Sequence, residues 1–437
     1  MNQSQANPLG TEKISALLLR FAIPSIIAMV VSALYNMVDQ FFIGRSVGML
    51  GNAATNVAFP LVITCTAIAL MCGIGGAANF NLCMGQHDKE NAASFAGNAV
   101  TMLFSLGVIL CIITRLFLKP MMVLFGATSQ VLNYSLIYTG ITSFGFPFLI
   151  LTTGGTNLVR ADGSPNYSMA CTLTGAVINT ILDPLLIFGF HMGIAGAAVA
   201  TVFGQIVAAS MALWFNLKFN KELDISMKGF HPNGHLIGQI YKVGAPSIVV
   251  QAIGSLMTYG MNLILAAFGS AQTVFGIYFK LQSFVFMPVF GLTQGLMPIM
   301  GYNYGARNKK RVTGAVKIGC VIALIIEIAG LIVFEICPGT LISIFNATPD
   351  LHEIGDSALR IIAIHFPMAA IGITLSTLFQ ATGHGMYSLV QSVMRQLVVL
   401  VPAAWLLSKI SLGAVWFCFP ISELISLIVT VVFFVIL

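Results

Sequence analysis

Residues 146–168, FPFLILTTGGTNLVRADGSPNYS, recur 220 positions later as FPMAAIGITLSTLFQATGHGMYS at residues 366–388. The two segments share a Phe-Pro pair at the start and a Tyr-Ser pair at the end, with no gap between them. At an offset of 222, AIPSI at residues 22–26 meets GAPSI at residues 244–248. Chance rarely produces such spacing, so we interpret the chain as an internal duplication.

Composition places this duplicated chain in a membrane. Of its 437 residues 57% are hydrophobic and only 8% are charged, whereas soluble domains carry about 25% charged residues. A membrane span needs roughly 20 mostly apolar residues. Twelve stretches satisfy this requirement: 15–43, 52–80, 92–118, 133–157, 166–190, 194–217, 238–267, 272–300, 312–337, 355–380, 386–408 and 413–437. We therefore predict an all-α integral membrane protein of twelve transmembrane helices in two six-helix pseudo-symmetric lobes.

The duplication also predicts the domain organisation. Residues 1–217 form the first lobe, residues 218–242 a basic cytoplasmic linker, and residues 243–437 the second lobe. The offset of 220 further pairs Gly75 with Gly295. Six spans per repeat give both halves the same orientation in the bilayer, which suits alternating access about a central cavity. The alternative is that duplication only builds a larger bundle for a channel or an enzyme.

Positive charges predict the orientation, because cytoplasmic loops carry an excess of Lys and Arg. With both termini in the cytoplasm, thirteen such residues lie inside, namely Lys13, Arg20, Lys89, Arg160, Lys218, Lys221, Lys228, Lys242, Arg307, Lys309, Lys310, Arg311 and Lys317. Five lie on the opposite side, namely Arg45, Arg115, Lys119, Arg360 and Lys409. The net charge of +6 is then explained by the orientation of the chain in the membrane and requires no nucleic-acid partner. We expect a monomeric, multi-pass protein of the plasma membrane, with residues 1–13 as a soluble tail.

Ionisable side chains inside a bilayer are costly and usually face protein or a watery path. Apart from groups near the span ends, the candidates inside the predicted spans are Asp39, Asp183, Lys280, Glu327, Glu335, Arg395 and Glu423. These seven residues are therefore the first candidates for a functional site.

Asp39 lies late in the first span, in YNMVDQFFIG, with Tyr35 and Asn36 about one turn earlier on roughly the same helix face. Tyr35 and Asn36 are accordingly candidates for lining a substrate cavity. Asp39 could instead be a structural hydrogen-bond acceptor or a helix-end residue. Pro24 removes a backbone hydrogen bond from this helix and provides a bending point, although ordinary curvature is equally compatible with it.

Asn179 and Asp183 stand four positions apart in NTILDPLLIFG of the fifth span, one above the other on one helix face. A carboxylate and an amide oxygen can bind a hard cation together, and Pro184 could free a nearby carbonyl. Alternatively, the Asp-Pro pair marks a turn near the membrane surface. Thr201 in the next span could add a hydroxyl ligand.

Two carboxylates brought together in a low dielectric repel one another, and a proton or Na⁺ would relieve that repulsion. Such a cation and a cargo could compete for binding, or each could favour a different conformation of the bundle. Either effect would couple their movements across the membrane. In the second half the position matching Asp183 is not acidic, and the seventh span has no carboxylate. Lys280 in the eighth span has three possible roles. It could line the cavity, extend its amine to the membrane surface, or form an ion pair with Glu327, Glu335 or Glu423.

No Walker-type glycine loop, His-Glu-x-x-His motif or Ser/His/Asp arrangement is present. We therefore expect neither an enzyme nor a cofactor. The 21 methionines and 32 phenylalanines could provide adaptable apolar contacts to a ligand. Most of them are expected to face lipid or neighbouring helices.

The chain resembles the multidrug and toxic compound extrusion (MATE) family over essentially its whole length. The resemblance rests on PSI…YNMVDQFFIG, GIGGAANFNLCMGQHDKENA with its counterpart LTQGLMPIMGYNYGARNKK, the RADGSPNYS and QATGHGMYS pair, and NTILDPLLIFG. It implies a V-shaped pair of lobes that exports amphipathic, mostly cationic compounds in exchange for Na⁺ or H⁺. It is nearest to the DinF-like, MepA-like bacterial branch.

By this resemblance, Asp39, Asn179, Asp183 and Thr201 match the N-lobe cation site of the DinF-like branch, where Na⁺ or H⁺ would bind. The C-lobe acidic pair of the NorM-like branch is absent, with Gln380 near the end of the tenth span. The nearest alternative function is a lipid-linked precursor flippase of the same superfamily, which would need several basic cavity residues. A membrane-embedded enzyme is a further alternative, disfavoured by the lack of a nucleophile or metal cluster.

Overall fold

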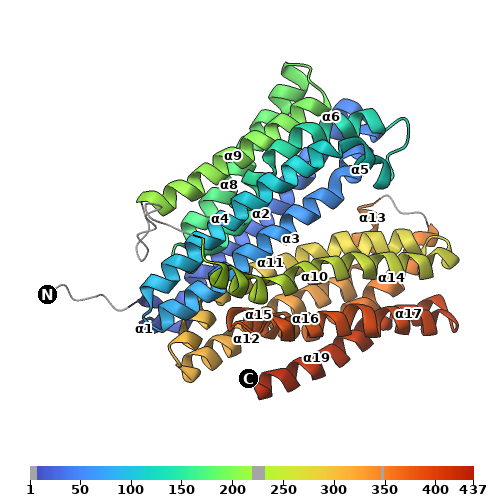
Figure 1. The fold of residues 1–437 in the computed structure, drawn as a ribbon. Helices are drawn as coiled ribbons and strands as arrows, with labels where there is room; N and C mark the ends of the chain where they lie inside the picture. The colour runs from blue at the N-terminus through green and yellow to red at the C-terminus, as the bar shows by residue number, and fades with distance from the viewer. Residues whose placement is uncertain (1–6, 219–231, 346–348) are drawn as a thin grey trace. The chain divides into compact units, whose positions relative to one another are not determined.

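The computed structural model describes residues 7–218, 232–345 and 349–437, and all regular structure in these ranges is helical (Figure 1). Within the described residues, eleven helices are long and apolar enough to cross a membrane. A twelfth crossing results if the bent pair Pro349–Ala363 and Phe366–Ala381 is counted as one span. The predicted all-α membrane fold is therefore confirmed.

The first half contains α1 (Pro8–Thr11), α2 (Ile14–Val47), α3 (Met49–Gly85), α4 (Lys89–Leu116), α5 (Leu118–Leu124), α6 (Leu132–Thr142), α7 (Phe146–Ala161), α8 (Pro165–Pro184) and α9 (Ile194–Lys218). The second half contains α10 (Gly234–Leu265), α11 (Ala271–Gly305), α12 (Lys309–Ile336), α13 (Pro338–Ser343), α14 (Pro349–Ala363), α15 (Phe366–Ala381), α16 (Gly385–Val393), α17 (Val401–Ser408), α18 (Leu412–Val415) and α19 (Cys418–Ile436). Short 3₁₀ segments are η1 (Ser143–Gly145) and η3 (Ala266–Phe268), and π-helical segments are η2 (Leu185–Gly189) and η4 (Met394–Leu400).

The tenth predicted span, 355–380, is not one straight helix. It is divided between α14 and α15, which are bent by 48° immediately before Phe366 and the proline that follows it. Proline fits the first turn of a helix because its missing N–H needs no partner there. In the first half η1 likewise separates α6 from α7 just before Phe146. The repeated Phe-Pro pair therefore marks matching helix starts.

The loops that follow α3 and α11 also repeat in conformation. His87 and Arg307, 220 positions apart, both adopt positive φ angles, of 63° and 55°. Asp88 and Asn308 then cap the next helix by accepting a hydrogen bond from the backbone N–H three residues on. A second hydrogen bond from Asn91 helps to hold the pKa of the exposed Asp88 carboxyl below its usual range.

Contacts divide the chain into two compact units. Unit 1 consists of Met1–Ile26, Pro246–Tyr304 and Asn308–Leu437, and unit 2 of Ile27–Ala245 and Gly305–Arg307. Consequently α2 changes unit after Ile26, and α10 changes unit before Pro246. The lobes predicted as 1–217 and 243–437 follow the sequence repeat rather than these contacts, and they remain a prediction. Residues 219–231 of the predicted linker lie outside the described residues.

Matching glycines allow these helices to pack closely within each unit. In unit 1, a Cβ on Gly295 of α11 would stand 2.7 Å from the backbone nitrogen of Ala22 in α2. In unit 2, a Cβ on Gly75 of α3 would stand 2.3 Å from the carbonyl oxygen of Ile240 in α10. The two glycines are the pair related by the 220-residue offset, so the repeat preserves one packing contact in both units.

The prediction that residues 1–13 form a soluble tail is wrong for the part that the structure describes. Leu9 is buried. The guanidinium of Arg311 donates hydrogen bonds to the carbonyl oxygens of Leu9 and Glu12, at 3.0 and 2.7 Å, and to the side-chain oxygen of Asn303 at 3.0 Å. Charge-assisted hydrogen bonds of this kind fix the segment onto unit 1.

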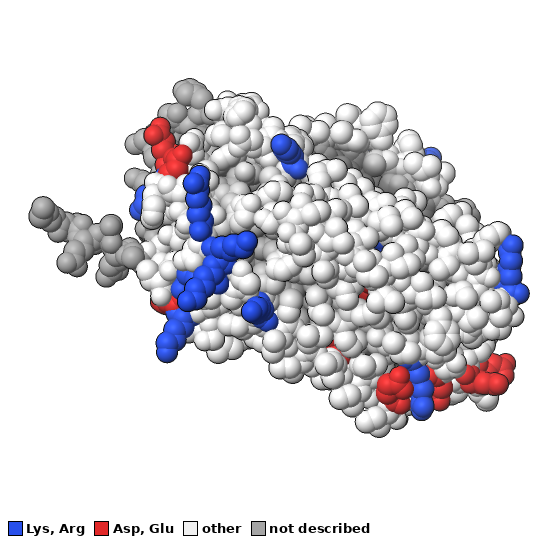
Figure 2. Space-filling model, turned by 90° about the horizontal axis from the view of Figure 1, so that it is seen from below, with Lys and Arg blue, Asp and Glu red and all other residues white. Residues whose placement is uncertain are grey.

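The surface agrees with a lipid environment around the helices. On the face shown in Figure 2, charged side chains gather toward the ends, and a broad middle band carries almost none. Large apolar side chains are at least half exposed on several helices, including Phe41, Trp214 and Ile332. Hydrocarbon tails solvate such side chains without the cost that water would impose.

Candidate cation site

Asn179 and Asp183 lie in the last turns of α8, and both side chains are buried. Their spacing of four residues places them on one face of the helix. After Pro184 the chain continues as the π-helical segment η2 rather than as a turn. The alternative interpretation of the Asp-Pro pair as a surface turn is therefore wrong. π-Helical segments within α-helices frequently occur at functional sites.

The amide of Asn179 joins α8 to α9. Oriented to satisfy both neighbours, its nitrogen donates to a carboxylate oxygen of Asp183 at 3.2 Å. Its oxygen accepts from the backbone N–H and the hydroxyl of Thr201, at 3.2 and 3.3 Å. An amide has separate donor and acceptor ends, so these contacts fix its direction. Asn179 therefore orients the Asp183 carboxyl.

Asp39 of α2 faces Asp183 across this site. The two carboxyl groups lie within hydrogen-bonding reach of each other, although 144 residues separate them in the chain. Asp39 is 7% exposed and Asp183 is 0% exposed. A hydrogen bond between two carboxyl groups requires that one of them carries a proton. The geometry therefore suits a single shared proton.

The same four side chains offer two carboxylates, one amide and one hydroxyl, which are oxygen ligands suited to a hard cation. In the orientation that satisfies both neighbours, the amide nitrogen of Asn179 faces Asp183, and a half-turn would direct its oxygen there. Binding of Na⁺ between the carboxylates would require this amide to turn. In the described ranges no group of three or more His, Cys, Asp and Glu side chains is placed to hold a metal ion.

Two tyrosines border the carboxyl pair. Tyr35 of α2 and Tyr138 of α6 both lie close enough to Asp39 and Asp183 to interact with their charges. Tyr35 was a sequence candidate, whereas Tyr138 was not. Nothing in the local sequence of the fourth span distinguishes Tyr138, because its role depends on how α6 packs against α2 and α8.

An apolar cluster surrounds this site within unit 2. Its buried members come from α2, α3, α6, η2, α9 and the residue before α6: Ile43, Ala54, Ala58, Val131, Tyr138, Ile187, Ile194, Ala197 and Ala198. Apolar packing of this kind keeps water away from the carboxyl pair and strengthens its electrostatic interactions. A proton or cation bound here is therefore held by few, specific partners.

The remaining sequence candidates lie outside this cluster. Asn36 is exposed, and its amide donates to the carbonyl of Ser32 at 2.8 Å. Lys280 of α11 is also exposed, with its amine 5.7 Å from the ring centroid of Phe345, a cation–π contact. Pro24 lies buried within α2, which continues as a helix on both sides of it.

Comparison with known proteins gives consistent matches along the chain. A family model described as MatE matches residues 24–185 and again residues 246–406, which supports the internal duplication. The multidrug export protein MepA of Staphylococcus haemolyticus (strain JCSC1435) is 26% identical over 402 residues, covering 91% of this chain and 88% of that protein. MepA of Staphylococcus aureus (strain MSSA476) is 25% identical over 403 residues, covering 91% and 89%.

Solved structures match the fold over nearly the whole length. One is described as the outward-facing conformation of a multidrug resistance MATE family transporter of the MOP superfamily. It has a TM-score of 0.92 and 24% sequence identity, covering 99% of this chain and 98% of that chain. A MOP superfamily transporter from Pyrococcus furiosus also has a TM-score of 0.92, at 23% identity and with the same coverage.

Proposed function

Because the chain belongs to the MatE family of multidrug transporters, in its MepA-like bacterial branch, we propose that it exports small amphipathic, mostly cationic compounds in exchange for protons. The observation that carries this proposal is the buried Asp39–Asp183 pair, whose carboxyl groups lie within hydrogen-bonding reach. The exchanged cation must bind at a group whose charge it changes. Uptake of one proton changes the net charge of the Asp39–Asp183 pair by one.

Coupling follows if the protonated and deprotonated pair favour different conformations. A ligand shifts an equilibrium only through its different affinities for the two states. Protonation removes the repulsion between Asp39 and Asp183 and would therefore favour the conformation that holds them together. Release of the proton on the cytoplasmic side would favour the other conformation, in which substrate binds. Alternating movement of the lobes 1–217 and 243–437 would then link the two events.

Protons are proposed rather than Na⁺ because the two buried carboxyl groups lie within hydrogen-bonding reach of each other, which suits one shared proton. Na⁺ would bind the same side chains, so the dependence of transport on each ion gradient distinguishes the two ions. The protein is further proposed to work as a monomer in the plasma membrane with both termini in the cytoplasm.

A lipid-linked precursor flippase is the weaker candidate. Recognition of a pyrophosphate would require several unpaired basic groups along the path. Lys280 and Arg395 are the two basic residues that the charge count assigned to neither side of the membrane, and Arg395 forms an ion pair with Glu423 at 3.5 Å. That leaves Lys280 alone for an anionic headgroup. The relatives in the MepA-like branch are named as multidrug export proteins.

Purified protein in sealed vesicles tests this proposal. Ethidium transport is measured with a pH gradient at equal Na⁺ on both sides, and separately with a Na⁺ gradient at equal pH. We expect transport to follow the pH gradient and to stop when an ionophore dissipates it. Transport that follows only the Na⁺ gradient would replace the proton by Na⁺ at the same site. Transport indifferent to both gradients would contradict secondary antiport altogether.

A further inference from the structure

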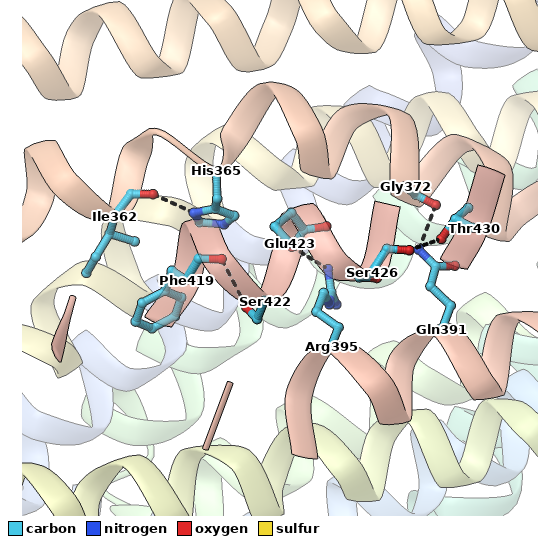
Figure 3. Close-up of polar contacts among 10 residues, drawn as sticks. All are labelled: Ile362, His365, Gly372, Gln391, Arg395, Phe419, Ser422, Glu423, Ser426 and Thr430. Carbon is cyan, nitrogen blue, oxygen red and sulfur yellow. Dashed lines mark hydrogen bonds and ion pairs between the residues drawn. The ribbon is translucent and has the colours of Figure 1, made fainter. Parts of the chain in front are cut away.

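Unit 1 contains a second cluster of buried ionisable groups, separate from the Asp39–Asp183 pair. In Figure 3 the side chains of Arg395, in η4, and Glu423, in α19, point toward each other. The guanidinium nitrogen lies 3.5 Å from a carboxylate oxygen, with the Glu423 side chain 4% exposed and that of Arg395 27% exposed. One guanidinium thus balances one carboxylate inside the helical bundle.

A second carboxyl group, Glu327 of α12, has no such partner. Glu327 is 0% exposed, and neither of its carboxyl oxygens has a hydrogen-bond partner. It lies close enough to Glu423 for the two charges to interact. An isolated ionised carboxylate in such a position is costly, because burial removes the water that would stabilise its charge.

Further unpartnered polar atoms come from helices around these carboxyl groups. The hydroxyl of Tyr278 in α11 is buried without a partner and interacts electrostatically with both Glu327 and Glu423. One carboxyl oxygen of Glu423 is also unpartnered, and a Cβ on Gly372 would stand only 3.4 Å from it. The glycine therefore leaves room beside Glu423 that any larger residue would fill.

The charges of the cluster do not balance. Glu327 and Glu423 carry two negative charges when ionised, and Arg395 carries one positive charge. Among the described residues, Tyr278 and His365 also interact electrostatically with this cluster, and Cys418 interacts with Tyr278. In the neutral His365 imidazole, Nδ1 donates to the carbonyl of Ile362.

Phe419 adds an uncharged aromatic ring to this cluster. Phe419 lies with its ring centroid 5.5 Å from that of Tyr278 and 5.9 Å from that of His365. With neutral His365, Tyr278 and Cys418 the cluster keeps a net charge of −1, which one monovalent cation would neutralise.

We propose that Glu327 is a second proton-binding carboxyl of this protein, which takes up and releases one proton while Glu423 stays paired with Arg395. On uptake, the proton forms an O–H bond with one of the two free oxygens of Glu327, and on release the carboxylate returns. A proton needs only one oxygen of Glu327, whereas the described residues hold no group of three or more His, Cys, Asp and Glu side chains placed to hold a metal ion. The proposal does not depend on which cation the Asp39–Asp183 pair binds.

Infrared spectroscopy tests this directly, because a protonated carboxyl group has a C=O stretching band distinct from that of a carboxylate. The starting protein is the Asp39→Asn/Asp183→Asn variant, in which the first site has no carboxyl group. The spectrum of this purified variant minus that of the same variant with Glu327→Gln cancels the other carboxyl groups, and it should show a carboxylic acid band that disappears as the pH rises. Glu335→Gln on the same helix, introduced into both proteins, should leave this difference band unchanged.

A second variant keeps the test informative if Glu327→Gln does not fold. Arg395→Gln removes the guanidinium, so Glu423 loses its partner and a second carboxylic acid band should appear. The proposal is overturned if the difference spectrum shows no titrating band, or if the band persists at every pH. It is also overturned if Na⁺ at constant pH removes the band. None of these infrared measurements depends on transport. Absence of proton antiport would therefore not be mistaken for absence of proton binding at Glu327.

Discussion

Asp183→Asn and Asp39→Asn are each expected to reduce ethidium efflux to the level of cells that lack the transporter. Either substitution leaves a neutral amide in the buried pair, so the charge of the site no longer changes when a proton arrives or leaves. Coupling free energies between sites are typically about 1–3 kcal/mol, or about 5–150-fold in affinity. Loss of a coupling of this size removes a bias of about tenfold or more between the conformations, so we expect only background efflux, measured as ethidium fluorescence in cells with matched amounts of protein.

Asp88→Asn is the matched control for these variants. It makes the same chemical change at an exposed helix cap, where Asp and Asn are about equally good. Its efflux should therefore equal that of the parent. If both site variants pump as well as Asp88→Asn, the Asp39–Asp183 pair does not couple transport. If only one of the two variants loses efflux, the pair does not act as a unit. The carboxyl group whose replacement leaves efflux intact is then dispensable.

Gly244→Ala is expected to produce the largest loss of stability. Gly244 lies in α10, and a Cβ added there would stand 1.9 Å from the backbone oxygen of Met71 in α3. Both residues belong to unit 2. Overpacking typically costs about 1–3 kcal/mol and occasionally more. Here the obstacle is backbone that cannot rotate away, so we expect the upper end of that range, measured as a lower thermal midpoint and yield in detergent.

Gly238→Ala provides the control on the same helix. Gly238 is exposed, and an added Cβ there would meet nothing within 4 Å. Alanine is favoured over glycine inside a helix by about 0.5–1 kcal/mol, so this variant should melt at or slightly above the parent temperature. Equal thermal midpoints for Gly244→Ala and Gly238→Ala would show that α3 and α10 do not approach as closely as the structure indicates.

Features that depend on neighbouring residues were predictable from the sequence. The apolar runs gave the helices, and the repeated Phe-Pro pair lies at matching helix starts, although the break at Phe366 itself was not predicted. Asn179 and Asp183 were paired correctly on one helix face because helical periodicity links residues four apart. The link from this pair to Asp39 came only from resemblance to a family, since no local rule joins residues so distant in the chain.

Features that depend on packing between distant helices were not predictable. Tyr138 beside the carboxyl pair carried no sequence signal, and Lys280 was a candidate partner for Glu423, which the structure instead pairs with Arg395. The interpretation of the first residues as a tail failed because the contacts of Arg311 with Leu9 span about 300 positions.

The sequence by itself determined that this is a duplicated, all-helical membrane protein with a few costly ionisable groups inside its spans. Hydrophobicity, charge and repeat spacing are properties of the chain that no folding step alters. Only the tertiary structure decided which of those groups share a site: Asp39 with Asp183 in unit 2, and Glu327 with Glu423 and Arg395 in unit 1. The physical reason is that electrostatic interactions depend on separation in space, which helix packing sets and sequence distance does not.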